Sequence, residues 1–240
     1  MIALNAAWHD LECGTYTEDL EVWRQLARSA GGPVLDIGAG TGRTAIDLAR
    51  AGVTVTAVDM DEELLAVLRE RAAGLPVTAV AADARTLALG QRFPLCIVPM
   101  QTAQLLGGAE GRRAFLERAR EHLTPGGRLA VALAEELEVF EVTVPALGPL
   151  PDIREIDGVV YSSRPTAVRA DGDGFVLERR REAVWPDGRM VSGESAISLD
   201  RLDAATLESE GGAAGLTPAE RIDIPATDEY VGSTVVVLCA

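Results

Sequence analysis

The sequence predicts an α/β protein with a doubly wound, mainly parallel sheet, and three observations carry this prediction. Apolar strand-like runs alternate with amphipathic helix-like segments from residue 33 to residue 133. The first run, residues 34–37, leads into a glycine-rich turn, which is typical of a buried strand followed by a helix. Between about residues 140 and 200 the apolar period changes to two, which indicates an antiparallel β-meander inserted into the chain.

The N-terminal segment, residues 1–16, holds an unusual density of side chains that can contact a ligand: Trp8, His9, Asp10, Cys13 and Tyr16. Such a segment is either a frayed terminus or part of a ligand site. Residues 20–30 follow as an amphipathic helix, which we expect to be capped by Thr17 and ended by Gly31 and Gly32.

Strands and helices alternate through the next part of the chain. Strands are expected at residues 34–37, 53–58, 77–81, 93–98 and 128–133, with helices at 43–51, 61–73 and 111–122. Consecutive units of this kind require right-handed crossovers and place the ligand crevice at the carboxyl ends of the strands. Asp36, Asp59 and Asp83 all lie at that edge, so we expect them to line one crevice.

The glycine turn at residues 38–42 does not fit a nucleotide-phosphate site. A dinucleotide-binding turn needs its third glycine at position 43, which is arginine, and a P-loop needs a lysine where Arg43 stands. Asp36 precedes the turn, and a carboxylate there repels phosphate and attracts an ammonium group. The turn is therefore expected to bind a small polar ligand through bare backbone amides and a helix N-terminus.

The pattern D-x-G-x-G-x-G at Asp36–Gly42 resembles motif I of the class I S-adenosylmethionine (SAM) dependent methyltransferases. Asp59 follows Gly38 by 21 residues and matches the acidic residue at the end of the family's second strand. Ala82-Asp83-Ala84 is similar to the family's adenine clamp. The resemblance covers residues 16–133 by motif and 200–240 by pattern. It implies a Rossmann-like, doubly wound, seven-stranded methyltransferase sheet, with the antiparallel β-meander inserted after the fifth strand.

The resemblance also implies a set of SAM-binding residues. Asp36, Gly38 and Gly40 would hold the amino-acid end of SAM, Asp59 and Met60 the ribose and adenine side, and Asp83 and Ala84 the adenine. A carboxylate such as Asp59 suits a ribose diol because it accepts two O–H bonds. The full expected set is Tyr16, Asp36, Gly38, Ala39, Gly40, Asp59, Met60, Asp83, Ala84, Pro99, Met100 and Gln101.

The methyl acceptor is expected to be a small molecule with a nitrogen or oxygen nucleophile. The segment after residue 98 lacks the aromatic cluster with which base methyltransferases hold a nucleobase, and it lacks the acidic ligand of the metal-dependent relatives, so no metal is expected. An oxygen acceptor would need a base, and the weak candidates are His9, Tyr16, Glu135 and Glu136. A SAM-binding sensor or scaffold without transfer activity and, less favoured, a nicotinamide-dependent oxidoreductase remain as alternatives.

Composition narrows the partners and the location. The net charge of −15 disfavours a nucleic-acid substrate, since no positive field would recruit it. All 22 basic residues are arginine, which excludes a lysine Schiff base or P-loop lysine. Three scattered cysteines fit a reducing, cytoplasmic protein without disulfides. No apolar run is long enough for a membrane span, so no membrane partner is expected.

The second half of the chain is expected to hold strands at residues 159–168, 175–185 and 189–199, then a helix at 203–214 and strands at 219–224 and 233–239. Arg179 and Arg181 share one face of the middle meander strand, which we expect to face solvent or a second copy of the chain. We expect one domain, 1–240, with an N-terminal lid and helix at 1–32, a SAM-binding core at 33–139, the insertion at 140–200 and a C-terminal part at 201–240. The insertion either roofs the active site or forms a homodimer interface.

Overall fold

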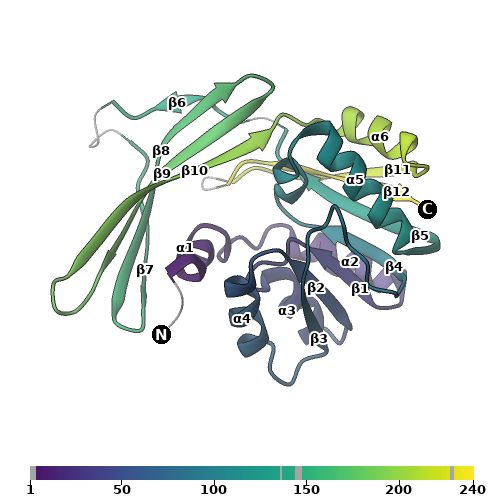
Figure 1. Cartoon of the computed structure of the whole chain (residues 1–240), viewed down its shortest axis with the longest axis horizontal. Helices are drawn as coiled ribbons and strands as arrows, with labels where there is room; N and C mark the ends of the chain where they lie inside the picture. The colour runs from purple at the N-terminus through teal and green to yellow at the C-terminus, as the bar shows by residue number, and fades with distance from the viewer. Residues whose placement is uncertain (1–3, 136, 144–147, 228–229) are drawn as a thin grey trace. The chain divides into compact units, whose positions relative to one another are not determined.

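The computed structural model describes residues 4–135, 137–143, 148–227 and 230–240 (Figure 1). Chain contacts divide the protein into two compact units. Met1–Tyr16 and Glu136–Arg201 form one, which we call the antiparallel unit, and Thr17–Glu135 and Leu202–Ala240 form the other, the parallel unit. The first sixteen residues thus group with the insertion rather than with the helix that follows them.

The parallel unit is built on a seven-stranded sheet in the order β11-β12-β5-β4-β1-β2-β3. The strands β1 to β5 run parallel, whereas β12 is antiparallel to both β5 and β11. Their bounds are Val34–Ile37 (β1), Val55–Asp59 (β2), Val77–Ala81 (β3), Phe93–Val98 (β4), Leu123–Leu133 (β5), Thr217–Ile224 (β11) and Ser233–Cys239 (β12). This order confirms the predicted doubly wound, Rossmann-like sheet, in which the strand order reverses between the parallel strands β1 and β4.

Helices cover both faces of this sheet, which explains why β1 is buried along its whole length. The helices are α2 (Leu20–Ala30), α3 (Arg43–Arg50), α4 (Glu62–Arg71), the 3₁₀ helix η1 (Thr102–Leu105), α5 (Gly108–Glu121) and α6 (Ala204–Ala213). Trp23 of α2 and Leu65 of α4 belong to the core on one face, and Phe115 of α5 and Leu207 of α6 to the core on the other. The site edge is thereby held between two packed layers.

Side-chain caps place several helix ends. Asp61, at the start of the helix expected at 61–73, caps α4 by accepting bonds from the amides of Glu63 and Leu64. The expectation that Thr17 caps α2 is wrong. The N-cap position belongs to Asp19, whose carboxylate does not cap the helix because it binds side chains instead.

The antiparallel unit contains helix α1 (Leu4–Cys13) and a second sheet, in the order β10-β9-β8-β6 with β7 paired to β8. The bounds are Phe140–Glu141 (β6), Asp152–Ile156 (β7), Val159–Asp171 (β8), Gly174–Val184 (β9) and Met190–Asp200 (β10). The three long strands confirm the predicted meander. The short strands β6 and β7 gave no sequence signal because their residues are mostly exposed and do not alternate in polarity.

Helix α1 packs on this sheet through a small apolar core and a buried ion pair. Ala7 and Leu11 contact the cluster around Tyr161 and Ala183. Glu12 accepts bonds from Nε and Nη2 of Arg181, both at 2.7 Å, and from Oγ of Ser163 at 2.6 Å.

This contact corrects the prediction for the arginine run of β9. The alternation holds, since Arg179 and Arg181 are mostly buried whereas Arg180 is 59% exposed. Arg181, however, binds Glu12 of α1 in the same unit, so its side chain is directed at that helix rather than at open solvent.

Candidate functional site

The glycine loop after β1 is held in a shape that only glycine supports. Gly38, Gly40 and Gly42 have φ of 74°, 54° and 95°, in the left-handed region. A Cβ on Gly38 would lie 2.5 Å from side-chain atoms of Thr102. The amides of Gly38 and Ala39 donate to the carbonyl of Val58 at 2.8 and 3.0 Å, which ties the loop to β2.

Asp59, at the end of β2, also holds the loop in place. One carboxylate oxygen accepts from the amide of Gly40 at 2.8 Å and the other from the amide of Asp61 at 2.9 Å. Because a carboxylate has about four acceptor positions, each oxygen can still accept from a ligand hydroxyl. The structure therefore brings Gly38, Gly40 and Asp59 together, as expected.

Asp36 is the most unusual residue of the site. Its side chain is fully buried, and neither carboxylate oxygen has a hydrogen-bond partner within the described part of the chain. Burial raises its pKa to about 8, Arg43 opposes this shift, and the negative charges of Asp59 and Asp19 reinforce it. A buried acceptor without a partner is costly in a folded protein, so it indicates a place where a donor or a cation binds.

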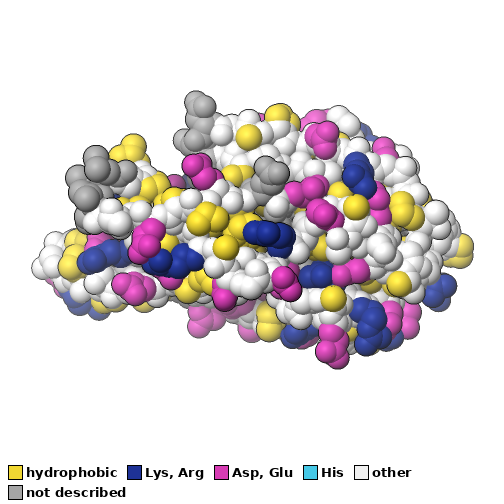
Figure 2. All heavy atoms as spheres, turned by 90° about the horizontal axis from the view of Figure 1, so that it is seen from above, with side chains coloured by type: hydrophobic (Ala, Val, Ile, Leu, Met, Phe, Trp, Pro, Cys, Tyr) yellow, Lys and Arg dark blue, Asp and Glu magenta, His cyan; other side chains and the backbone are white. Residues whose placement is uncertain are grey.

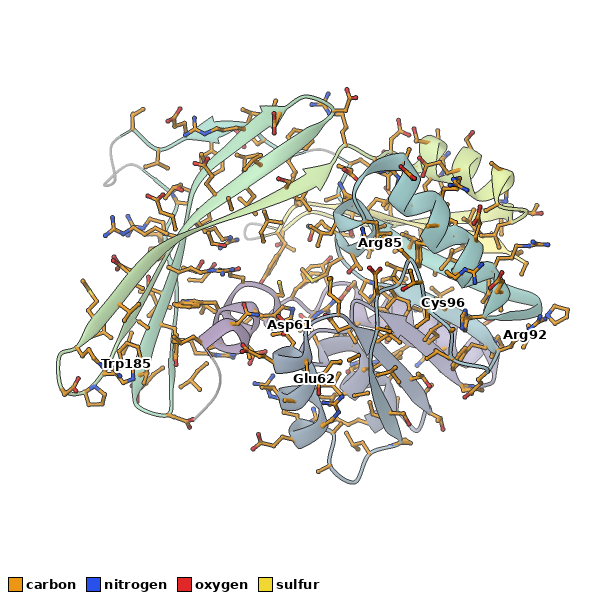
Figure 3. The ribbon with its side chains drawn as sticks, viewed as in Figure 1. Asp61, Glu62, Arg85, Arg92, Cys96 and Trp185 are labelled. Carbon is orange, nitrogen blue, oxygen red and sulfur yellow. The ribbon has the colours of Figure 1, made fainter. Side chains whose placement is uncertain are left out.

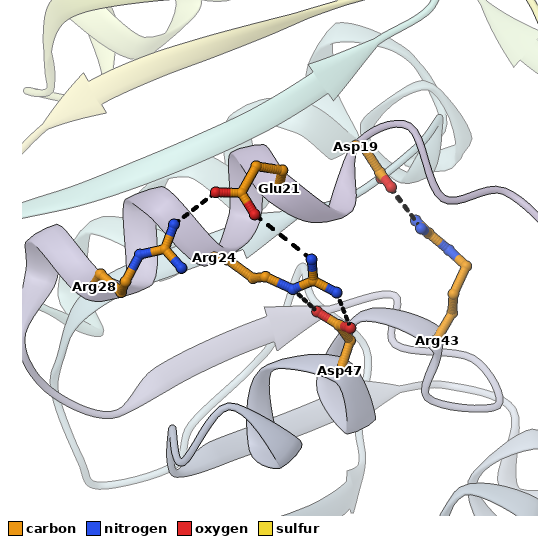
Figure 4. A network of polar contacts seen from close by, with 6 residues as sticks. All are labelled: Asp19, Glu21, Arg24, Arg28, Arg43 and Asp47. Atoms are coloured by element: carbon orange, nitrogen blue, oxygen red, sulfur yellow. Dashed lines mark hydrogen bonds and ion pairs between the residues drawn. The ribbon is translucent and has the colours of Figure 1, made fainter.

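An ion pair that the sequence did not reveal lies beside the loop (Figure 4). Arg43, the first residue of α3, donates from Nη1 and Nη2 to the two oxygens of Asp19, at 2.5 and 2.7 Å. Asp19 is 1% exposed and accepts a third bond, from the indole nitrogen of Trp23 at 2.8 Å. The local signal for one of these contacts is a four-residue spacing. Asp19 directly precedes the predicted helix, and Trp23 lies in its first turn.

The residues expected at the adenine side lie at the ends of β2 and β3. Asp83 is bound by Nε and Nη2 of Arg85, which holds the pKa of the Asp83 carboxyl below its usual value. Met60 is 74% exposed although it is large and apolar, and Ala84 is partly buried. An exposed apolar side chain next to Asp59 suits the flat face of a base.

The segment after β4 approaches the glycine loop from the other side. Pro99 is buried, Gln101 is half-buried, and Met100 adopts φ of 55°, which is rare outside glycine. Thr102 lies against Gly38 and donates to the carbonyl of Pro99 at 3.1 Å. The segment is therefore packed against the loop, and its role at the methyl-donor end stays a prediction.

Gln104 of η1 joins this segment to the end of β5. Its side chain donates to the carbonyl of Ala134 at 3.1 Å and accepts from the amide of Ala134 at 3.0 Å. Glu135, one of the candidate bases, directly follows this clamp and is half-buried.

The other candidate bases are not assembled with it in one unit. His9 and Tyr16 belong to the antiparallel unit, on α1 and just after it, and Tyr16 is buried. Glu136 lies outside the described residues. The role of each of these residues as a base stays a prediction.

His122 has a structural role. It ends α5, where its Nδ1 donates to the carbonyl of Arg118 at 2.7 Å while Nε2 accepts from the amide of Leu89 at 3.0 Å. The Cys96 thiol (Figure 3) is fully buried in β4, and burial followed by the charge of Asp36 raises its pKa far above the usual range. Neither side chain is available for chemistry.

The described residues hold no group of three or more His, Cys, Asp or Glu that could bind a metal ion. No helix among them is long and apolar enough to cross a membrane.

The expectation of bare loop amides is wrong for Gly38, Ala39 and Gly40, whose N–H groups already donate to Val58 and Asp59. Chemically, the site offers a buried carboxylate for a cation, a glycine loop that a ligand can approach closely, and a carboxylate with free acceptor positions for a diol. Comparison with known proteins agrees with this arrangement. A family model described as a methyltransferase domain matches residues 34–127, which contain the loop, Asp59 and Asp83.

Individual relatives extend the likeness. A cypemycin N-terminal methyltransferase of Streptomyces is 36% identical over 97 residues, which make up 40% of this chain and 40% of that protein. The chain thus spans less than half the length of this curated relative. The methyltransferase CcbJ of Streptomyces caelestis has a TM-score of 0.69 at 26% identity, with coverage of 95% and 97%. CalS10 of Micromonospora echinaspora, an amino pentose methyltransferase, has a TM-score of 0.73 at 20% identity, with coverage of 100% and 97%.

Proposed function

Because the chain belongs to the class I SAM-dependent methyltransferase family, we propose that it transfers a methyl group from SAM to an amine nitrogen of a small molecule. One observation carries the proposal: Asp36, buried and without a hydrogen-bond partner among the described residues, lies beside a glycine loop that is tied to Asp59. A cationic amino group and a vicinal diol on one ligand match these two carboxylates, and SAM carries both.

Each part of SAM then has a partner at the edge of the sheet. The ammonium group of SAM interacts with Asp36, and its amino-acid end lies against the glycine loop, where the absence of Cβ atoms permits close approach. The ribose hydroxyls donate to Asp59, whose oxygens keep acceptor capacity beyond the bonds from Gly40 and Asp61. The adenine lies between Met60 and the end of β3, where Asp83 is held by Arg85 and Ala84 follows it.

Nitrogen is the favoured acceptor because a neutral amine attacks without prior loss of a proton. Its lone pair forms the new N–C bond as the C–S bond breaks, the bonding pair goes to sulfur, and the ammonium product later loses a proton to water. An alkoxide route would in addition need a base at the acceptor, which a neutral amine does not. The names of the cypemycin enzyme, which acts at an N-terminus, and of the amino pentose methyltransferase also point to amines.

The protein contributes mainly by alignment. Well-oriented reactants can lower a barrier by roughly 7–11 kcal/mol without any acid or base. The clamp of Gln104 on Ala134 and the contact of Thr102 with Gly38 would hold the methyl-donor end of the site rigid. Pro99, Met100 and Gln101 are proposed to line it. The sequence-based expectations for Tyr16 and for a lid at residues 1–16 stay predictions.

A nucleic-acid substrate is not part of the proposal. On the face shown in Figure 2, acidic and arginine side chains are interspersed, so no large positive patch forms there.

A homodimer through residues 140–200 is supported by β10, an eleven-residue edge strand on which Met190 and Val191 are 58% and 42% exposed. The cytoplasmic location expected from the cysteines stays a prediction.

Calorimetric titration with SAM tests the cofactor, and mass spectrometry of small amines and alcohols incubated with SAM tests the transfer. We expect measurable binding, a roughly 10- to 100-fold weaker affinity in Asp59→Ala, and methylated amines rather than alcohols. Asp203→Ala, which removes a helix cap far along the chain, is the matched control. No heat at millimolar SAM would refute the proposal, whereas binding without any methylated product would favour a SAM-binding protein that lacks transfer activity.

A further inference from the structure

The buried ion pair between Asp19 and Arg43 does more than join two helices. A second pair, Arg24 with Asp47, already links α2 to α3 through two bonds at 2.8 and 2.5 Å (Figure 4). That pair is partly exposed, with 35% and 20% of the two side chains accessible, as expected for a surface link. Asp19 and Arg43 are 1% and 10% exposed, so their charges are little screened by water and act more strongly on neighbouring groups than those of the surface pair.

The buried pair is placed where it can act on Asp36. Arg43 begins the helix that follows the glycine loop, and its positive charge favours the ionised form of Asp36. Asp19 binds both Nη atoms of Arg43, and its own negative charge acts on Asp36 in the opposite direction. The indole of Trp23 holds the Asp19 carboxylate in this orientation. The positive charge of Arg43 that acts on Asp36 is therefore already bound by the carboxylate of Asp19.

The remaining charged and titratable groups around Asp36 are few. Asp59 on β2 adds negative charge, and the Cys96 thiol on the neighbouring strand β4 is neutral. Arg43, which is engaged by Asp19, and the backbone amide of Ala45 favour the ionised form of Asp36, but they do not offset its burial and the two neighbouring negative charges. The cation that would do so is the ligand.

We propose that Asp19 and Arg43 are positioning residues that keep Asp36 from being neutralised by the protein and so reserve it for the ammonium group of SAM. The inference rests on the proposed function and assigns a role to two residues outside the SAM-binding set. Without Asp19, the positive charge of Arg43 would act on Asp36 with less opposition from a neighbouring carboxylate. Without Arg43, Asp36 would lose the cation that favours its ionised form.

The two ends of the pair must then act in opposite directions. In Asp19→Asn, Asp36 ionises at a pH lower by about one unit or more, because the negative charge of Asp19 is lost while the positive charge of Arg43 remains. In Arg43→Gln, Asp36 ionises at higher pH. Asp47→Asn, which breaks the neighbouring pair of the same two helices, leaves the midpoint unchanged. A merely structural pair would lower stability in both variants without moving the midpoint either way.

Two measurements on the whole protein carry the test. The Asp36 carboxyl is followed by ¹³C NMR against pH in the free protein, with the signal assigned by its loss in Asp36→Asn. The affinity for SAM is measured calorimetrically over the same pH range. Opposite shifts in Asp19→Asn and Arg43→Gln support the inference; equal shifts, or none, overturn it. If wild-type protein does not bind SAM, the proposed function fails, and the NMR titration still decides whether the ion pair controls Asp36. If one variant does not fold, the shift or its absence in the other decides the question.

Discussion

The parallel and antiparallel units each bury a carboxylate, and the two carboxylates differ in their hydrogen-bond partners. Glu12 in the antiparallel unit accepts three bonds from Arg181 and Ser163. Asp36 in the parallel unit has no hydrogen-bond partner among the described residues. Burial raises the pKa of Glu12, but the bonds from Arg181 and Ser163 outweigh it and lower the pKa overall, whereas burial dominates for Asp36 and raises its pKa to about 8. A satisfied buried charge stabilises packing; an unsatisfied one indicates a ligand site.

The largest effect is expected from Asp36→Asn. Between the ordinary pKa of 3.8 and the folded value of about 8, the folded wild type holds one more proton than the unfolded chain, so its free energy of unfolding falls as pH rises. Each unit of that difference corresponds to about 1.4 kcal/mol. Asp36→Asn has no carboxyl to ionise, so its free energy of unfolding does not fall in this way. Above pH 8 the variant should be several kcal/mol more stable than wild type, yet it should bind SAM poorly. Chemical denaturation at acidic and alkaline pH measures the gain, and equal stability loss at both would contradict the interpretation.

Glu12→Gln should have the opposite consequence. It leaves Arg181 without its buried carboxylate and should destabilise the protein by about 3 kcal/mol. Because the pKa of Glu12 is lowered, its contribution is present above its ordinary value of 4.5 and is lost as pH falls through the folded value. Denaturant titration at neutral and acidic pH checks both statements.

The matched control for Glu12 is Glu182→Gln, whose partner Arg180 is 59% exposed. Exposed pairs contribute about 0–1 kcal/mol. If the two glutamine variants lost similar stability, Glu12 would not be the structural counterpart that the comparison requires.

Gly38→Ala separates the shape of the ligand loop from its charge. The substitution keeps Asp36 but places a methyl group 2.5 Å from Thr102 at φ of 74°. Gly52→Ala has φ of 86° and no atom within 4 Å, so it measures the backbone strain alone, about 1–2 kcal/mol. Gly38→Ala should cost more stability and weaken SAM binding, as thermal unfolding and calorimetry would show. Equal effects of the two variants would mean that the contact with Thr102 is unimportant.

The smallest effect is expected from Asp203→Ala. Asp203 is an exposed carboxylate that accepts from the amide of Thr206 at the start of α6. Loss of such a cap costs about 1 kcal/mol. Thermal unfolding should show this loss while SAM affinity stays at the wild-type value, and a change in affinity would show that acidic residues outside the site also matter for binding.

The sequence predicted the parallel unit well because its signals are local. Each strand is a short apolar run, and the glycine turn and the aspartates at the strand ends identify the ligand edge. It also predicted the long strands of the meander, where alternation and the turn at Gly172 are visible. Helix α1 was not predicted, since its segment was equally compatible with a frayed terminus.

The missed features depend on contacts between distant residues. Asp19 and Arg43 are 24 residues apart, and Glu12 and Arg181 are 169 apart. No periodicity reveals such pairs, because they form only once α2 lies on α3 and α1 on the second sheet. The same reason explains why Arg181 was assigned to an exposed face. It also explains why the sequence predicted Asp36 as a ligand residue but gave no sign that its buried carboxyl lacks a hydrogen-bond partner among the described residues.

Proton release on SAM binding tests the central claim most directly. Calorimetric titrations are run in buffers of different ionisation enthalpy, at a pH about one to two units below the Asp36 pKa, where the free carboxyl is protonated and the amino group of SAM is charged. The account predicts that close to one proton leaves the protein for each SAM bound, and that Asp36→Asn releases none. Binding of SAM to wild-type protein without proton release would contradict it.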